Sequence, residues 1–61
     1  MKKEFGFNER PFVRVWSYDS NLNEEVELVG EVLWVDGMFM KVSFTDGFKI
    51  VDVRETKYEL L

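Results

Sequence analysis

The chain has 61 residues, a formal net charge of −4, no cysteine and no histidine. This length allows one domain, and the lack of cysteine excludes disulfide bonds. A domain of this size buries only about 60% of the surface that its unfolded chain exposes, so it depends on dense packing or on self-association. Six Phe, two Trp and two Tyr are available for packing in the core or for self-association.

No run of residues reaches the roughly 18 apolar positions that a membrane span requires. The first residues, Met1 to Phe5, are basic but lack the apolar segment of a signal peptide. We therefore expect a soluble, cytoplasmic protein.

The first clear strand runs from Phe12 to Tyr18 and follows Pro11, whose missing N–H is tolerated at the start of a strand. Before it, residues 1–10 are expected to form an N-terminal arm or a short extra element, in which Phe5 and Phe7 plug one open end of the fold. Alternation divides the strand into two faces, with Val13, Val15 and Ser17 on one and Phe12, Arg14, Trp16 and Tyr18 on the other.

A polar loop, Asp19 to Glu24, leads to the second strand, Glu25 to Val35. The first five residues of this loop match the first five positions of a calcium-binding loop, but the sixth is Glu24 instead of glycine. Asn, Asp and Ser side chains hydrogen-bond the backbone in turns. We therefore expect a turn held by such hydrogen bonds and no metal site.

Gly30 lies in the middle of the second strand, where glycine often marks a bulge or a sharp bend. Val26 and Leu28 before it alternate with glutamates and are expected to point to the core. A bend with positive φ at Gly30 would let one strand serve two sheets, and a Cβ there would then unfold the domain.

Two Asp-Gly dipeptides, Asp36-Gly37 and Asp46-Gly47, predict hairpin turns of type I′, with positive φ at both central residues. They separate a third strand, Met38 to Phe44, from the strands on either side, and a fourth strand follows at Phe48 to Val51. A last strand within Val53 to Leu60 closes the sheet. The expected inward residues of these strands are Met38, Met40, Val42, Phe44, Phe48, Ile50 and Val53.

Helical spacing is not sustained over ten residues anywhere in the chain. The pattern predicts a single all-β domain over residues 1–61. We expect a small five-stranded SH3-like or Sm-like barrel whose central strand is bent at Gly30.

Four segments of this pattern also carry a resemblance to a family: Val13 to Tyr18, Val29 to Val32, Val35-Asp36 and Phe48 to Val53. They resemble the YolD-like family, and the Gly30 to Asp36 spacing is similar to the first half of the Sm-like motif. The resemblance implies a small bacterial or prophage protein with an Sm-like core, of a kind often encoded beside error-prone DNA polymerases. Sm-like RNA binders carry an asparagine where this chain has Met40, and Phe48 to Arg54 lacks their second motif. The resemblance therefore implies the fold and not Sm-type RNA binding.

Acidic residues are concentrated between Arg14 and Lys41, a stretch without any basic residue. This predicts a strongly negative edge that keeps the protein soluble and protects the sheet. The alternative is an acidic face for a basic partner. The acids in the stretch are Asp19, Glu24, Glu25, Glu27, Glu31 and Asp36.

Catalysis has few candidate residues, because serine and threonine lack their usual activating base in a chain without histidine. A pair of carboxylates can do acid–base chemistry, but a small barrel rarely has a cleft that desolvates two of them. We expect no enzymatic activity, no cofactor and no metal.

The main hypothesis is a non-enzymatic protein-binding module, such as a phage or prophage adaptor or inhibitor, because exposed aromatics beside acids suit a protein partner. At least half of the four aromatics Trp16, Tyr18, Trp34 and Phe39 are expected to pack in the core. A homodimer is a separate prediction, since one small core cannot hold every apolar residue. The candidate partner-binding residues are Trp16, Tyr18, Trp34, Phe39, Glu25, Glu27 and Glu31.

The alternative function is binding of single-stranded nucleic acid, in which aromatics stack on bases beside a basic groove. The cations available for it are Arg14, Lys41, Lys49 and Arg54. A continuous basic strip would favour this function, and scattered cations would count against it.

Overall fold

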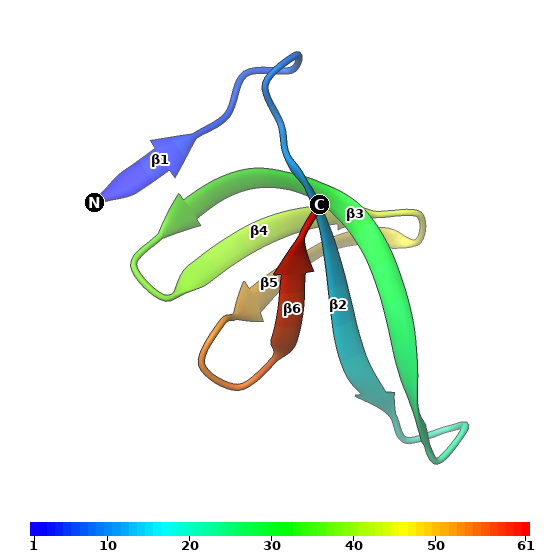
Figure 1. Ribbon diagram of the computed structural model, residues 1–61. Coiled ribbons are helices and arrows are strands. Elements are labelled where there is room, and N and C mark those ends of the chain that lie inside the picture. The colour runs from blue at the N-terminus through cyan, green and yellow to red at the C-terminus, as the bar shows by residue number, and fades with distance from the viewer.

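The computed structural model describes all 61 residues, which form six strands and no helix (Figure 1). The strands pair antiparallel in one sheet of order β5-β4-β3-β2-β6, and β1 pairs with β3. The all-β prediction is therefore confirmed. No helix is present that could cross a membrane. The strands are β1 (Lys2–Glu4), β2 (Phe12–Asp19), β3 (Glu24–Asp36), β4 (Phe39–Phe44), β5 (Gly47–Asp52) and β6 (Lys57–Leu60).

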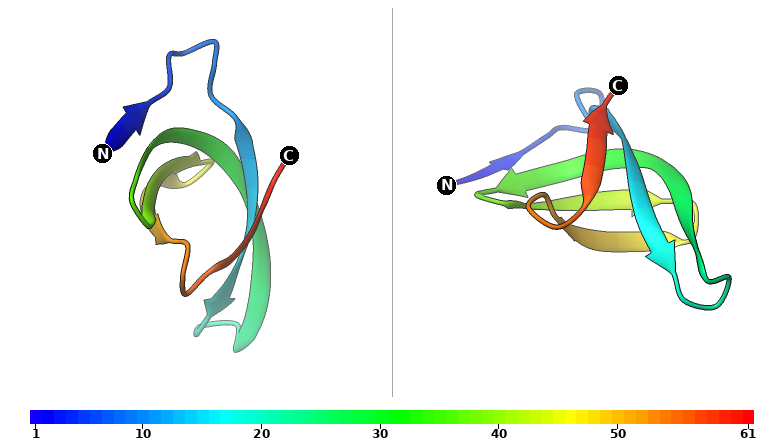
Figure 2. Two further views of the ribbon diagram at one scale, coloured as in Figure 1. Left: turned by 60° about the vertical axis from the view of Figure 1, so that its left-hand side comes forward. Right: turned by 60° about the horizontal axis from the view of Figure 1, so that its bottom comes forward.

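The sheet is strongly curved but is not closed into a barrel (Figure 2). Its end strands do not pair with each other, since β5 pairs only with β4 and β6 only with β2. All four residues of β6 are used against β2. The expected closed, five-stranded barrel is thus replaced by an open sheet with one additional strand, β1, from the N-terminal segment.

β3 is the strand that connects the two halves of the sheet, as predicted for the central strand. Its residues 24–31 pair with β2, and on its opposite edge residues 31–36 pair with β4. β1 pairs with residues 34–36 of β3, on the edge of β3 that β2 does not occupy there. Figure 1 shows β3 curving across the molecule between these neighbours.

The irregularity in β3 lies at Leu33 and not at Gly30, because the register with β4 shifts between Val32 and Trp34. Val32 and Val35 are an odd number of positions apart, so strict alternation would turn them to opposite faces. The extra residue of the β-bulge returns the side chain of Val35 to the face of Val32. Both valines therefore contribute to the core, Val32 fully and Val35 at its margin.

Gly30 is needed because of a close approach between strands. It is buried, and its φ is not positive, in contrast to the φ of Gly37 and Gly47. An added Cβ would lie 2.5 Å from the carbonyl oxygen of Ser43 and 2.8 Å from side-chain atoms of Val42 and Phe44. β4 thus approaches the inner side of β3 so closely that only a hydrogen fits between them.

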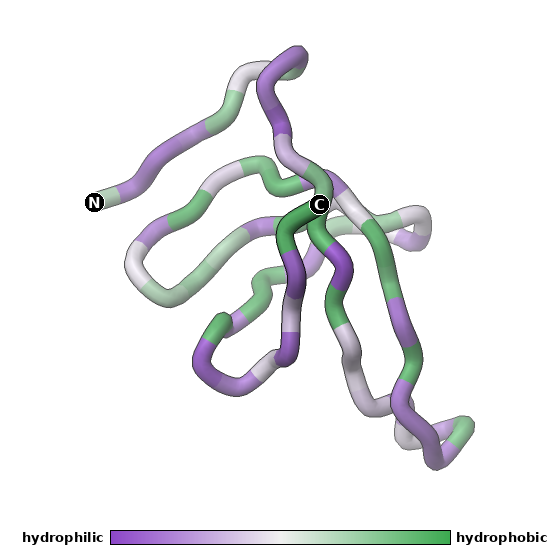
Figure 3. Tube along the Cα trace, viewed as in Figure 1, coloured by the Kyte–Doolittle hydropathy of each residue, from purple (hydrophilic) through white to green (hydrophobic).

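The core consists of alternate residues from β2 to β5, as expected from their period of two. Figure 3 shows this alternation as hydrophobic and hydrophilic segments that follow one another along the strands. Phe5 and Val53 pack against it as predicted, but Phe7 is 80% exposed, so only one of the two N-terminal phenylalanines plugs the fold. The buried side chains are Val13, Val15, Val32, Met40, Val42, Phe44 and Val51.

Phe48 and Ile50 were expected to point inward, and this prediction is wrong: they are 65% and 57% exposed. The turn before them is centred on Thr45–Asp46 and not on the Asp-Gly dipeptide, because Phe44 pairs with Gly47. Phe48 pairs with Ser43 and Ile50 with Lys41, and paired residues point to the same face of a sheet. Ser43 and Lys41 alternate with the buried residues of β4 and therefore lie on the outer face. The face of β5 that was predicted to be buried is therefore its outer face.

The first hairpin turn also differs from the predicted type I′ turn. It is centred on Gly37 and Met38, because Asp36 pairs with Phe39. Gly37 has a φ of 60°, whereas Met38 has no positive φ, which matches a type II′ turn. As a turn residue, Met38 is 39% exposed instead of buried.

Asp52 organises the turn between β5 and β6. Its Oδ1 accepts the backbone N–H of Arg54 at 2.9 Å, and its Oδ2 lies 2.9 Å from Nη2 of the Arg54 guanidinium. Its carbonyl oxygen accepts the N–H groups of Glu55 and Thr56, both at 3.1 Å. The hydrogen bonds from Arg54 hold the pKa of Asp52 below its ordinary value of 3.8.

We predict that Gly30→Val leaves the domain largely unfolded. Overpacking a core costs about 1–3 kcal/mol and sometimes more, and a domain of this size has only about 3–5 kcal/mol of net stability. Thermal melts of the two proteins test this. Gly6→Val is the control, because an added Cβ there comes no nearer than 3.8 Å to its neighbours. A Gly30→Val protein that melts at the parent temperature would contradict the close approach.

We predict that Arg54→Ala lowers stability at neutral pH but not in acid. A carboxyl with a lowered folded-state pKa stabilises the fold above its ordinary pKa, and this contribution is lost as the pH falls through the folded-state value. The difference in melting temperature between parent and variant should therefore shrink as the pH falls below the ordinary pKa of 3.8 and vanish once the pH lies below the folded-state pKa of Asp52. A difference that stays constant across this range would contradict the role of the Asp52 charge.

Candidate functional site

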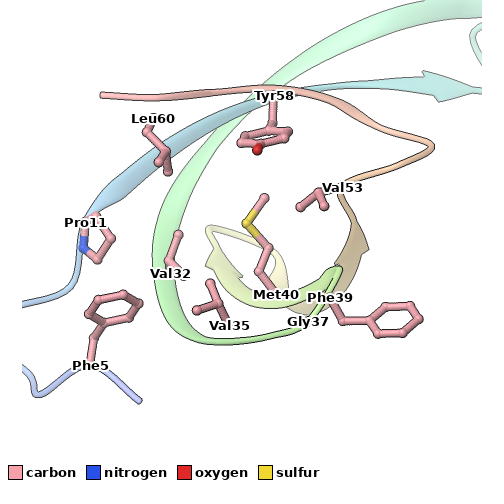
Figure 4. A pocket seen from close by; sticks show the side chains of 10 residues that line it. All are labelled: Phe5, Pro11, Val32, Val35, Gly37, Phe39, Met40, Val53, Tyr58 and Leu60. Carbon is pink, nitrogen blue, oxygen red and sulfur yellow. The ribbon is translucent and has the colours of Figure 1, made fainter. Parts of the chain in front are cut away.

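An apolar groove of about 300 Å³ opens on the inner side of the sheet, between β6 and the second half of β3 (Figure 4). Its lining residues come from the N-terminal segment, from residues 32–40 and from the C-terminal part of the chain, and none of them is charged. Figure 4 shows Tyr58 and Leu60 on one side and Met40 and Val53 across from them, with Phe5 beside Pro11. The groove is the space that closure of the sheet would have filled.

The two residues of β6 in the groove face inward but remain uncovered. Tyr58 pairs with Val15 and Leu60 with Val13, so both share the face that forms the core. They are nevertheless 41% and 61% exposed. Sequence reasoning assigned this strand to closure of the sheet and so missed the groove. The alternation of Tyr58 and Leu60 indicates that both side chains point to the same face. Alternation does not show whether another strand covers that face.

The residues predicted to bind a partner are divided between two parts of the outer face. On the β2–β3 hairpin, Trp16 lies opposite Glu27 and Tyr18 opposite Glu25, and Glu31 follows further along β3. These five residues are therefore neighbours on one surface, as the hypothesis requires.

The other two predicted residues, Trp34 and Phe39, lie on the second half of the sheet. Trp34 is opposite Lys41, and Phe39 is opposite Asp36. Phe39 is one of the residues that line the groove, but in Figure 4 its ring points away from it. None of the four candidate aromatics belongs to the core cluster, so the expectation that half of them pack there is wrong. The open sheet leaves their face without a covering layer.

Cations from neighbouring strands offset the acidic stretch of β3. Arg14 on β2 lies 3.6 Å from Glu27 and 3.1 Å from Glu59 of β6, and Arg10 lies 3.9 Å from Glu31. Lys57 of β6 stands 4.8 Å above the Trp16 ring. The strongly negative edge predicted from the sequence is thus partly neutralised by strand pairing.

The loop between β2 and β3 is held by the predicted side chain–backbone hydrogen bonds. Oδ1 of Asp19 accepts the N–H of Asn21 at 2.9 Å and that of Leu22 at 3.3 Å. The Tyr18 hydroxyl donates to Oδ1 of Asn23, the one non-glycine residue with a positive φ. Asp19 therefore stabilises the turn between β2 and β3 by accepting backbone hydrogen bonds.

The basic residues considered for nucleic-acid binding do not form a strip. Arg14, Lys49 and Arg54 each lie within 4 Å of a carboxylate, at 3.1, 3.7 and 2.9 Å respectively. Lys41 stands 5.1 Å above the ring of Phe48. They come from β2, β4, β5 and the turn after β5. Scattered, paired cations count against a groove for single-stranded nucleic acid.

No family model, curated protein or solved structure matches the chain. The resemblance to the YolD-like family and to Sm-like barrels therefore stays a prediction.

Proposed function

We propose that the chain is a non-enzymatic protein-binding module, of adaptor or inhibitor type, that holds an apolar segment of a partner protein in the groove under β6. The exposure of Tyr58 and Leu60 on the inner face of the sheet supports this proposal most directly. Removing such surface from water contributes roughly 25 cal/mol per Å². A partner segment that covers both side chains would thus complete the thin core.

The lining of the groove defines the chemistry of the segment. No charged residue lines it, so a charged side chain brought into it would lose its hydration without gaining an ion pair. The aromatic walls formed by Phe5 and Tyr58 favour apolar or aromatic side chains. An extended segment with one apolar face fits this requirement.

We also propose that the sheet is an opened SH3-like or Sm-like barrel. Strands β2 to β6 account for the five expected strands, and the curvature of β3 brings its two halves toward a common interior. The bound segment would then occupy the place where the barrel is open.

Selection from a displayed library of random peptides tests the function. We expect enriched peptides to carry an apolar pattern, and we expect Leu60→Asp to weaken their binding at least tenfold. Leu22→Asp is a matched control, because Leu22 is 60% exposed against 61% for Leu60 and lies in the loop between β2 and β3. Circular dichroism verifies that both variants are folded.

Two results would overturn the proposal. One is a selection that yields no saturable peptide. The other is a set of peptides that bind the parent and Leu60→Asp equally well, which would place the binding surface outside the groove.

A further inference from the structure

We propose that two copies of the chain associate by pairing their β5 strands antiparallel about a two-fold axis at Ile50. The pairing joins two open sheets into one continuous sheet. It uses the outer edge and outer face of β5 and is independent of the groove under β6.

β5 is an end strand whose outer edge pairs with no other strand. The right-hand view of Figure 2 shows it at the margin of the sheet, beyond β4. A turn of two residues makes Phe44 and Gly47 a hydrogen-bonded pair, and every second pair after it is of the same kind. The pattern ends at Met38 and Val53, where the Val53 N–H donates to the Met38 carbonyl at 2.9 Å. The residues whose N–H and C=O groups point away from β4 are therefore Phe48, Ile50 and Asp52.

The outward-pointing N–H and C=O groups of β5 are arranged symmetrically about Ile50. A two-fold axis there pairs Ile50 with the second copy's Ile50 and Phe48 with the second copy's Asp52, so each outward-pointing residue has a partner. Moving the axis to Lys49 would instead set two lysines directly opposite each other, which is destabilising. The backbone and the charges thus select the same register.

The side chains of this edge are apolar and exposed. Phe48 and Ile50 are 65% and 57% exposed on the outer face, next to Ser43 and Lys41 of β4. The Ile50 register buries the two isoleucines against each other. It also places Phe48 opposite Asp52, whose carboxylate is already paired with Arg54 at 2.9 Å. No uncompensated charge enters the contact.

The distribution of charge favours this edge for a second copy of an acidic chain. Residues 39–54 contain three bases, Lys41, Lys49 and Arg54, against two acids, Asp46 and Asp52, which is a net charge of +1. The whole chain carries −4, so the remaining residues carry −5. The other long free edge, the first half of β3, carries Glu24, Glu25 and Glu27 and would repel its own copy.

Sedimentation with charge-swapped variants tests the dimer and its axis. The parent should approach twice its 7.3 kDa mass as its concentration rises. Ile50→Asp and Ile50→Lys should each raise the dimer dissociation constant at least tenfold, because like charges meet across the axis. An equimolar mixture of the two should recover association. Leu22→Asp, at 60% exposure, should leave the dimer unchanged.

Cross-linking tests the register, because the chain has no cysteine of its own. Opposite residues of a hydrogen-bonded pair lie about 5.5 Å apart between Cα atoms, within the span of a disulfide. Ile50→Cys should therefore form a covalent dimer under mild oxidation. Lys49→Cys is the control, because its opposite residue in this register is Val51 of the second copy.

Several outcomes would overturn the inference. A parent protein that stays monomeric at millimolar concentration would contradict the dimer. The free edge of β5 would then be available to pair with a strand of another protein. A dimer that Ile50→Asp does not weaken, or a mixture of charged variants that does not associate, would place the contact elsewhere. Equal cross-linking of the Lys49→Cys and Ile50→Cys variants would contradict the axis.

Discussion

The close approach of β3 and β4 at Gly30 is the constraint on which the rest of this small domain depends. The Cα of Gly30 faces the carbonyl of Ser43 at a distance that leaves no room for a side chain. Because the strands meet this tightly, β3 can pair with β2 on one edge and with β4 on the other while the sheet stays curved around one core. The bulge at Leu33 then keeps Val32 and Val35 on the inner face.

The core that results is thin, and its size explains the apolar surface. Only seven side chains are buried, and large apolar residues remain exposed on both faces. On the inner face, β6 ends after four residues and leaves Tyr58 and Leu60 without a facing strand. On the outer face, no second layer covers Phe48 or Ile50. An open sheet of this size thus presents apolar surface both at its interior and at its edge.

Strand pairing also redistributes the charges. The acidic residues of β3 are concentrated in one segment of the chain, but their neighbours in space come from segments far away in the sequence. Arg14 and Lys57 reach Glu27 and Trp16 because β2 lies between β3 and β6. Linear charge patterning therefore overstates the negative potential of this region. The balance near β5, in contrast, follows from residues that are close in both sequence and space.

Gly30 was predicted to be a bend with positive φ, whereas the close approach of β4 is what excludes a side chain there. The sequence by itself determined the all-β class, the approximate strands and the core positions Met40, Val42 and Phe44 of β4. These follow from local rules, since period-two alternation and turn residues act over a few positions. Tertiary structure alone decided which face of β5 is buried, whether the sheet closes and which aromatics are exposed. Phe48 and Ile50 lie on the outer face because they pair with Ser43 and Lys41, which alternate with the buried residues of β4. Closure depends on whether β5 and β6 meet across the sheet, and no local pattern in either strand encodes that contact.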